Sequence, residues 1–256
     1  MDQTVENRLE PRHGRPMPKA APAQAKPSAK KPAVRKPAAK RLNPAEKARI
    51  QEIFDRFAAA EAEPRTELNY HDPFTLVVAV ALSAQATDKS VNKATERLFE
   101  DAPTPAAMAA LGVEGLEPYI RTIGLYRTKA KNVVALSNIL LNQYGGQVPL
   151  RRDALQALPG VGRKTASVVL NELGVEPAIA VDTHVFRVAH RLKLASGSTP
   201  DKVEQQLMAV IPQPYLTRAH HWLILHGRYV CVARKPKCIQ CVVADLCPSR
   251  SLFIGA

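Results

Sequence analysis

The chain has 256 residues, of which 46% are hydrophobic, and its formal net charge is +13. This length allows one large domain or two smaller ones with a substantial core. No stretch reaches the roughly 18 apolar residues of a membrane span, and no apolar segment near the start predicts a secretory signal. We therefore expect no membrane association and a cytoplasmic location.

The charge is unevenly distributed along the chain. Residues 1–42 contain eleven Lys or Arg and three Asp or Glu, a net charge of +8, so residues 43–256 carry +5. Seven of the 21 prolines also lie in residues 1–42, among Ala and Lys. Such a segment cannot bury enough apolar surface to offset the entropy of ordering, and we predict a disordered tail. Two roles remain open for it, namely a solubilising tail and a nonspecific tether to a polyanion.

From residue 43 onward the sequence predicts helices. Four pairs combine an N-cap residue with a proline at the first helical position: Asn43-Pro44, Asp72-Pro73, Thr104-Pro105 and Thr199-Pro200. Apolar residues at helical spacing predict further helices over 129–144, over 163–173, and over 215–226 with an end before Gly227. No sustained alternation of apolar and polar residues predicts a strand. We expect an all-α protein of about ten short helices.

A glycine-containing turn precedes the helix predicted at 163–173. In the sequence LPGVG at 158–162, the two glycines allow a tight turn and a close approach of the backbone to a ligand. The free amides of the next helix would point back at this turn, where the helix dipole favours an anion such as a DNA phosphate. An ordinary turn between helices is the alternative, but the residues that follow favour phosphate binding. The predicted phosphate-contacting residues are Gly160, Val161, Gly162, Arg163 and Thr165.

Lys164 is the candidate nucleophile, although a solvated surface lysine is the ordinary alternative. An amine attacks only when it is neutral, and the reference pKa of lysine is about 10.4. A helix N-terminus, the adjacent Arg163 and a partly desolvated pocket would each favour the neutral form. Asp182, eighteen positions further on, is the candidate carboxylate partner. It could also cap the helix that follows, a role that is compatible with catalysis.

All four cysteines lie within 17 residues near the end of the chain, at Cys231, Cys238, Cys241 and Cys247. Zinc ribbons usually present two Cys-x2-Cys pairs separated by a longer segment, whereas this array has one such pair. Four thiolates wrapped this closely favour a [4Fe-4S] cluster over zinc. The loop between the first two cysteines is basic. Its cations could contact phosphates or balance the charge of the cluster; they are Arg234, Lys235 and Lys237.

With these features in view, the chain resembles the endonuclease III family, the helix-hairpin-helix, iron–sulfur DNA glycosylases and AP lyases of base-excision repair. The resemblance extends over about residues 43–250 and leaves the tail outside. It includes the sequences LSAQATD at 82–88, IGLY at 123–126 and HWLILHGR at 221–228.

The resemblance implies two helical domains that flank a DNA-binding cleft. One is a six-helix barrel over about residues 66–176 that carries the hairpin, and the other joins residues 43–65 to 177–250 and holds the cluster. Gln85 and Leu125 match the family positions that enter the duplex when the damaged nucleotide is flipped out. The implied partner is damaged double-stranded DNA, and we expect a monomer associated with the nucleoid of a bacterium.

The expected reaction is removal of oxidised pyrimidines from DNA followed by strand cleavage 3′ to the abasic site through β-elimination. Lys164 would attack C1′, and Asp182 would support the positive charge that develops on the sugar. A pyrimidine-dimer glycosylase of the same family would share both residues. A noncatalytic iron–sulfur DNA-binding or redox-sensing protein is the alternative from another class, and the presence of both residues argues against it.

Overall fold

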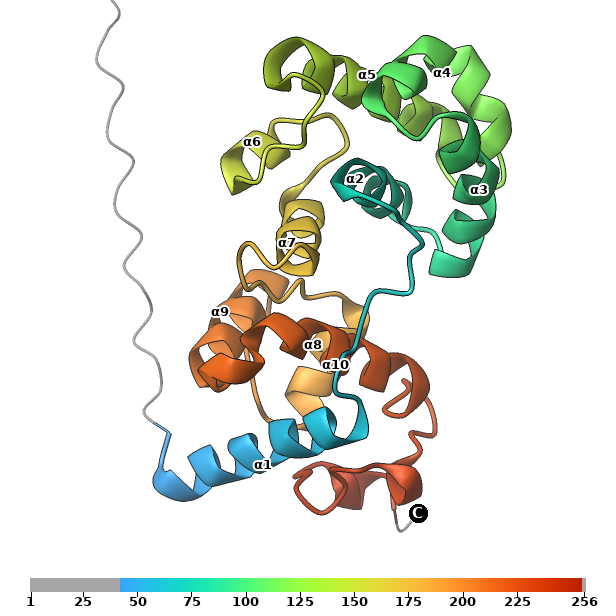
Figure 1. The fold of residues 1–256 in the computed structure, drawn as a ribbon. Helices are drawn as coiled ribbons and strands as arrows, with labels where there is room; N and C mark the ends of the chain where they lie inside the picture. Colours follow the sequence, from blue (N-terminus) through green and yellow to red (C-terminus); the bar gives the residue numbers. More distant parts are fainter. Residues whose placement is uncertain (1–41, 255–256) are drawn as a thin grey trace, which may run out of the picture. The chain divides into compact units, whose positions relative to one another are not determined.

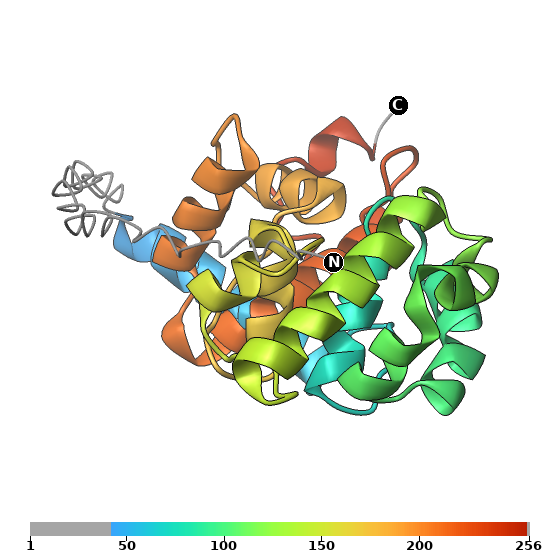
Figure 2. The same cartoon turned by 90° about the horizontal axis from the view of Figure 1, so that it is seen from above.

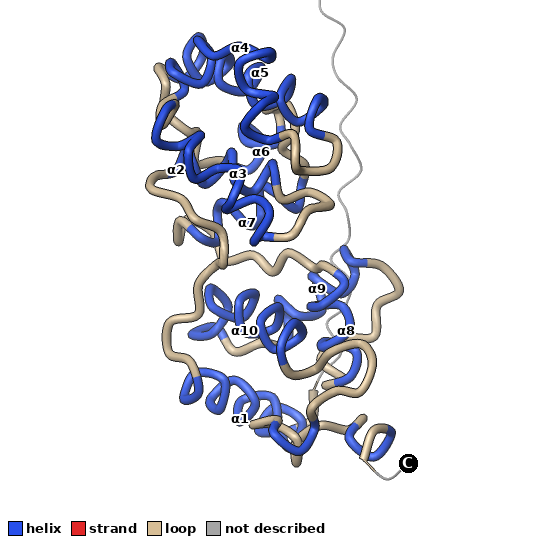
Figure 3. Tube along the Cα trace, turned by 90° about the vertical axis from the view of Figure 1, so that its right-hand side faces the viewer, coloured by secondary structure: helices blue, strands red, loops and turns tan. Residues whose placement is uncertain are grey.

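The computed structural model describes residues 42–254. Over this range the chain is helical and contains no strand, which confirms the all-α prediction (Figure 3). The predicted tail at 1–42 lies outside the described residues except for Leu42. Among the helices in this range, none is long and apolar enough to cross a membrane.

Ten α-helices follow one another in the described part of the chain. They are α1 (Pro44–Ala60), α2 (Pro73–Leu82), α3 (Asp88–Asp101), α4 (Pro105–Ile120), α5 (Tyr126–Tyr144), α6 (Arg152–Gln156), α7 (Arg163–Glu172), α8 (Thr183–Arg191), α9 (Pro200–Val210) and α10 (Leu216–Tyr229). Three short 3₁₀ helices accompany them: η1 (Gln213–Tyr215), η2 (Cys238–Gln240) and η3 (Arg250–Leu252).

The four predicted helix starts are confirmed. At each of them the side chain of the N-cap residue accepts a hydrogen bond from the amide three residues later, and proline follows at the first helical position. These caps satisfy amides that have no partner inside the helix. The predicted end of α5 is also confirmed, because Gly145 adopts the left-handed conformation there, with φ of 59°.

The helices are organised around two separate hydrophobic cores (Figure 1). The first core lies among α2 to α7, where α4 and α5 pack side by side (Figures 1 and 2). The second core joins α1 to α8, α9 and α10. The chain therefore crosses between the two groups of helices twice, over residues 61–72 and 173–182. A site between the groups can take side chains from both.

Helix α1 lies against the C-terminal segment that contains the cysteines. The Arg49 guanidinium donates a hydrogen bond of 2.9 Å to the carbonyl of Leu246. The Arg56 guanidinium donates to the carbonyl of Val242 at 3.1 Å and pairs with Asp245 at 2.6 Å. The beginning of the described chain thus supports the cysteine segment near its end.

One predicted helix end was wrong. The sequence predicts that the helix after residue 215 ends before Gly227, but α10 continues through this glycine to Tyr229. A Cβ atom at Gly227 would lie 2.9 Å from Cβ of His184 and 3.2 Å from Cγ2 of Val188. Gly227 therefore permits close packing of α10 against α8 and does not terminate a helix.

We predict that Gly227→Ala destabilises the protein by about 1–3 kcal/mol, because the added methyl group overpacks this helix crossing. Urea unfolding followed by circular dichroism measures the change. Gly115→Ala is the matched control, since a Cβ at this helical glycine in α4 meets only ordinary contacts at 3.4 Å and beyond. Equal free energies of unfolding for Gly227→Ala and the unsubstituted protein would contradict the proposed role of this glycine.

Candidate active site

A cavity of about 630 Å³ lies between side chains of both helix groups. Helix α7 contributes Lys164 and Thr165, and the start of α8 contributes Asp182. The loop after α2 contributes Gln85, and α10 contributes several polar side chains. The structure therefore brings the two predicted catalytic residues into one cavity together with two of the predicted DNA-contact residues.

Lys164 is the second residue of α7, directly behind the glycine turn. Its side chain is exposed. Gly162 occupies the N-cap position, and no side chain caps this helix. The first amides of α7 therefore keep the hydrogen-bonding capacity that an anion at a helix N-terminus uses.

The two glycines of the turn serve different purposes. Gly160 has φ of 78°, and a Cβ there would lie 3.1 Å from Cβ of Asn132, so both conformation and packing require glycine. Gly162 has φ of −83°, and a Cβ there would meet nothing within 4 Å. Val161 is buried in the first core and anchors the turn. Because neither conformation nor packing requires a glycine at 162, its small size fits close approach of a ligand.

Arg163 is held by α9 in the structure. Its guanidinium pairs with Asp201 at 2.9 Å and with Glu204 at 2.9 Å. A contact between Arg163 and a phosphate would compete with these carboxylates, so the predicted DNA contact of this residue stays a prediction.

Asp182 caps α8, as its position in the sequence allows. Its Oδ1 accepts hydrogen bonds of 2.8 Å from the amides of His184 and of Val185. This geometry fixes the carboxylate at the wall of the cavity. Both bonds end on the same oxygen, so the cap and a role toward a substrate are compatible.

The loops that carry Gln85 and Leu125 lie next to each other. A Cβ at Gly124 would lie 3.9 Å from the carbonyl oxygen of Gln85. Gln85 and Leu125 both adopt the left-handed conformation, with φ of 57° and 60°. Both are exposed, Leu125 by 62%, although it is a large apolar side chain. Strained backbone at exposed non-glycine residues is typical of functional loops.

A buried chain of polar groups backs the cavity, and sequence reasoning missed it. His221 Nε2 lies 3.0 Å from Oε2 of Glu172, and the Tyr70 hydroxyl donates a 2.9 Å hydrogen bond to Oε1 of Glu172. Burial alone would raise the pKa of Glu172, but the hydrogen bond and charge of His221, with Tyr70, hold that pKa below its ordinary value. Glu172 thus fixes the orientation of His221, which lines the cavity.

His220 is the second histidine in this wall and was also missed. It is 4% exposed, and its Nδ1 has no hydrogen-bond partner among the described residues. Burial, together with the charges of His221, Lys164 and Arg228, lowers the pKa of His220 to about 3. His220 is therefore neutral at pH 7. In the sequence, the adjacent histidines His220 and His221 among apolar residues of α10 could have indicated this buried polar wall.

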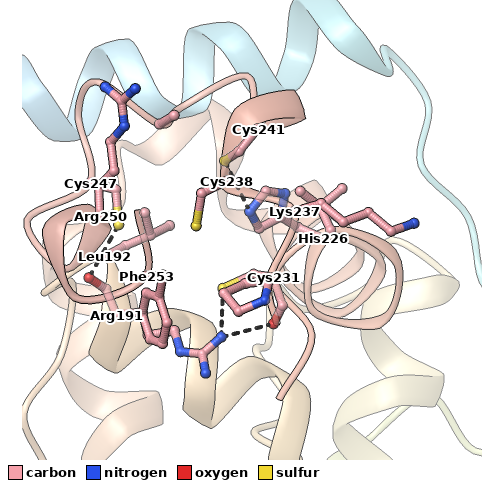
Figure 4. Close-up of a pocket in the computed structure, with 13 residues that line it drawn as sticks. Arg191, Leu192, His226, Cys231, Lys237, Cys238, Cys241, Cys247, Arg250 and Phe253 are labelled. Atoms are coloured by element: carbon pink, nitrogen blue, oxygen red, sulfur yellow. Dashed lines mark hydrogen bonds between the residues drawn. The ribbon is translucent and has the colours of Figure 1, made fainter. Parts of the chain in front are cut away.

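The four cysteines line a second pocket, formed by the end of the chain, the end of α8 and α10 (Figure 4). None of Cys231, Cys238, Cys241 and Cys247 forms a disulfide. Burial raises the pKa of the Cys241 and Cys247 thiols. Thiolates at these positions therefore need a strongly cationic centre beside them.

Known proteins resemble this chain in both sequence and structure. HhH-GPD superfamily base excision DNA repair proteins match residues 78–213, and the iron–sulfur binding domain of endonuclease III matches residues 231–247. Endonuclease III of Escherichia coli (strain K12) is 56% identical over 201 residues, which are 78% of this chain and 95% of that protein.

The chain belongs to the endonuclease III family. Two solved structures resemble it. A trapped endonuclease III–DNA covalent intermediate in an estranged-adenine complex is 44% identical, with a TM-score of 0.75 over 82% of this chain and 99% of that one. A non-covalent endonuclease III–DNA complex is 45% identical, with a TM-score of 0.74 over 80% and 97%. This family member is a DNA glycosylase and AP lyase of base-excision repair that binds DNA and carries a [4Fe-4S] cluster.

The cysteine pocket of this endonuclease III family member fits the cluster. Four thiols face one space (Figure 4). Within residues 42–254, no three Cys, His, Asp or Glu side chains come together in a way that would hold a single metal ion. Zinc needs sulfurs at about 2.3 Å from one shared ion, whereas a cluster separates its ligands more widely. Four cysteine sulfurs are the donor set that a [4Fe-4S] cluster takes.

The basic loop of this protein contains Arg234, Lys235 and Lys237, and all three side chains are exposed. Lys235 adopts the left-handed conformation, with φ of 53°. Lys237 also lines the cysteine pocket, so it lies near the cluster site (Figure 4). Their contact with DNA phosphates stays a prediction.

The two turn glycines give a paired test. Gly162→Ala should keep the free energy of unfolding and weaken binding to abasic-site DNA by about tenfold, because an added methyl group pushes a phosphate away from charge-assisted hydrogen bonds. Gly160→Ala should instead lower the free energy of unfolding by about 1–2 kcal/mol through left-handed strain. Fluorescence anisotropy and urea unfolding measure the two effects. Normal DNA affinity of a folded Gly162→Ala protein would exclude close approach at this glycine.

Proposed function

We propose that this chain excises oxidised pyrimidines from duplex DNA and then cleaves the strand 3′ to the abasic site by β-elimination. The observation that carries the proposal is the cavity that Lys164, Asp182 and Gln85 line together. The N-terminus of α7, which carries Lys164, has no side-chain cap and has open space at Gly162. This combination suits a phosphate-anchored nucleotide whose C1′ faces an amine.

The target nucleotide must first leave the duplex, because a stacked base shields C1′. Gln85 and Leu125 are suited to replace it, since both are exposed at the tips of adjacent loops and their backbones are already held in a strained conformation. The turn at 158–162 and the amides of α7 would hold a phosphate of the same strand. Exposed Arg234 and Lys235 would add sequence-independent contacts to the backbone.

Base excision follows from nucleophilic attack by the neutral amine of Lys164. The electron pair of the amine forms a bond to C1′ while the bond from C1′ to the base nitrogen breaks. The electrons of the broken bond leave with the base, which takes up a proton, and the new ammonium group on Lys164 loses one. Positive charge develops on the sugar, and the carboxylate of Asp182, fixed by the cap of α8, stabilises it.

Strand cleavage uses the same nitrogen. The C1′–O4′ bond breaks as Lys164 forms a Schiff base with C1′, and O4′ takes up a proton. The Schiff base acidifies C2′, whose proton leaves, and the C3′–O bond then breaks to release the 3′ phosphate. Water finally hydrolyses the imine and regenerates the amine of Lys164.

We assign the ligands of the cluster to Cys231, Cys238, Cys241 and Cys247. The cluster supplies the iron–thiolate bonds that hold this segment folded beside α1. We further propose that the protein acts as a monomer on nucleoid DNA.

The central prediction concerns Lys164. Borohydride should trap a covalent complex between the protein and abasic-site DNA, and Lys164→Gln should abolish it because an amide nitrogen cannot form a Schiff base. Denaturing gel electrophoresis detects the complex. The same substitution at Lys202, an exposed residue of α9 outside the cavity, is the matched control and should trap normally. Undiminished trapping by Lys164→Gln would remove Lys164 from the mechanism.

A second prediction separates the two roles of Asp182. Asp182→Asn keeps a cap but loses the charge, so single-turnover excision should fall by about 10²–10³ while the stability stays nearly unchanged. Asp182→Ala loses both, and its free energy of unfolding should drop by a further ~1 kcal/mol. Excision of thymine glycol from a defined duplex measures the rate. A normal rate for Asp182→Asn would reduce this residue to a helix cap.

A further inference from the structure

We propose that Arg191 and Phe253 together raise the reduction potential of the cluster and protect it from oxidants. The inference rests on the proposed ligand set, because it concerns side chains that contact one of those cysteines. We call these two residues the Arg191–Phe253 pair. They come from the end of α8 and from the residue after η3, and both line the cysteine pocket (Figure 4).

The Arg191 guanidinium is fixed by hydrogen bonds. Its Nη1 donates to Sγ of Cys231 at 3.4 Å and to the carbonyl of Val232 at 2.7 Å. Its Nη2 donates to the carbonyl of Ala233 at 2.9 Å. The guanidinium is therefore anchored by the backbone that follows the first cysteine, and one N–H points at the sulfur itself.

Arg191 also contacts the opposite side of the pocket. Its backbone carbonyl oxygen lies 3.6 Å from Sγ of Cys247. The last cysteine and the first cysteine thus meet the same residue. A change of the Arg191 side chain leaves this carbonyl in place and acts directly on the sulfur of Cys231 alone.

Phe253 covers the guanidinium from outside. Cζ of Arg191 lies 4.5 Å from the centroid of the Phe253 ring, within the range of a cation–π contact. Figure 4 shows the ring beside Arg191 at the edge of the pocket. Phe253 is 38% exposed, so one face of the ring meets solvent while the other covers the cation. The ring therefore separates the Arg191–Cys231 contact from water.

Arg191 stabilises the reduced state of the cluster relative to the oxidised state. A hydrogen bond to a ligand sulfur and a nearby permanent cation both favour the state of the cluster with more electrons. Arginine stays charged at every relevant pH, so this effect does not switch off. Loss of an electron from the cluster is therefore opposed by Arg191. The Phe253 ring adds to the protection of the cluster, because it limits access of water and small oxidants to the side that Arg191 contacts.

The test uses the full-length protein with its cluster. Arg191→Met removes the charge and the donor at similar length, and voltammetry should give a lower potential for loss of one electron from the cluster. Arg191→Lys keeps the positive charge but lacks the forked donors of the guanidinium. Its cluster should have a reduction potential between those of the unsubstituted protein and Arg191→Met. Oxidative bleaching by ferricyanide, followed by the visible absorbance of the cluster, should be about tenfold faster for Arg191→Met.

Phe253→Ala tests the cover without touching the hydrogen bonds to Cys231. It should accelerate bleaching, whereas Leu252→Ala should not, because Leu252 is 74% exposed and does not line the pocket. Iron content and the melting temperature are measured for every variant. A protein without iron would overturn the ligand assignment of the proposed function. Full iron content with unchanged potential and bleaching in both Arg191→Met and Phe253→Ala would overturn this inference alone.

Discussion

The interleaving of two hydrophobic cores is the constraint on which the rest of the structure depends. Because α1 belongs to the core of α8, α9 and α10, the chain must leave that core, build the first one and return. The return places the N-terminus of α7 and the N-terminus of α8 at the same cavity, and residues 173–182 connect the two helices. The proposed nucleophile, Lys164, and its proposed carboxylate partner, Asp182, thus lie on helices that pack in separate cores.

The N-termini of two helices, α7 and α8, lie at the cavity, and their capping differs. At the start of α8, Asp182 accepts hydrogen bonds from two amides, whereas the start of α7 has no side-chain cap. A cap satisfies orphan amides, whereas an uncapped start leaves them for an anion. The same physical need therefore fixes the carboxylate in one place and provides for a phosphate in the other.

The sequence predicts the local features of this protein well because they depend on neighbouring residues. The proline-marked helix starts and the end of α5 at Gly145 follow from capping preferences that act over three or four residues. Gly227 was misinterpreted because its role comes from His184, a residue more than forty positions away on α8. Glu172 and His221 were missed for the same reason. Their pairing joins α7 to α10 across the chain and leaves no spacing pattern.

Helix α8 connects the two sites of this protein. It has nine residues, so its length is only about 13 Å. Asp182 caps its first turn at the catalytic cavity, and Arg191 ends it at the cysteine pocket. The close contact of Gly227 with His184 prevents α8 from shifting without α10. The short helix that positions the proposed catalytic carboxylate of Asp182 at its start therefore also presents the Arg191 cation to the sulfur of Cys231 at its end, and this helix couples the geometry of the two sites.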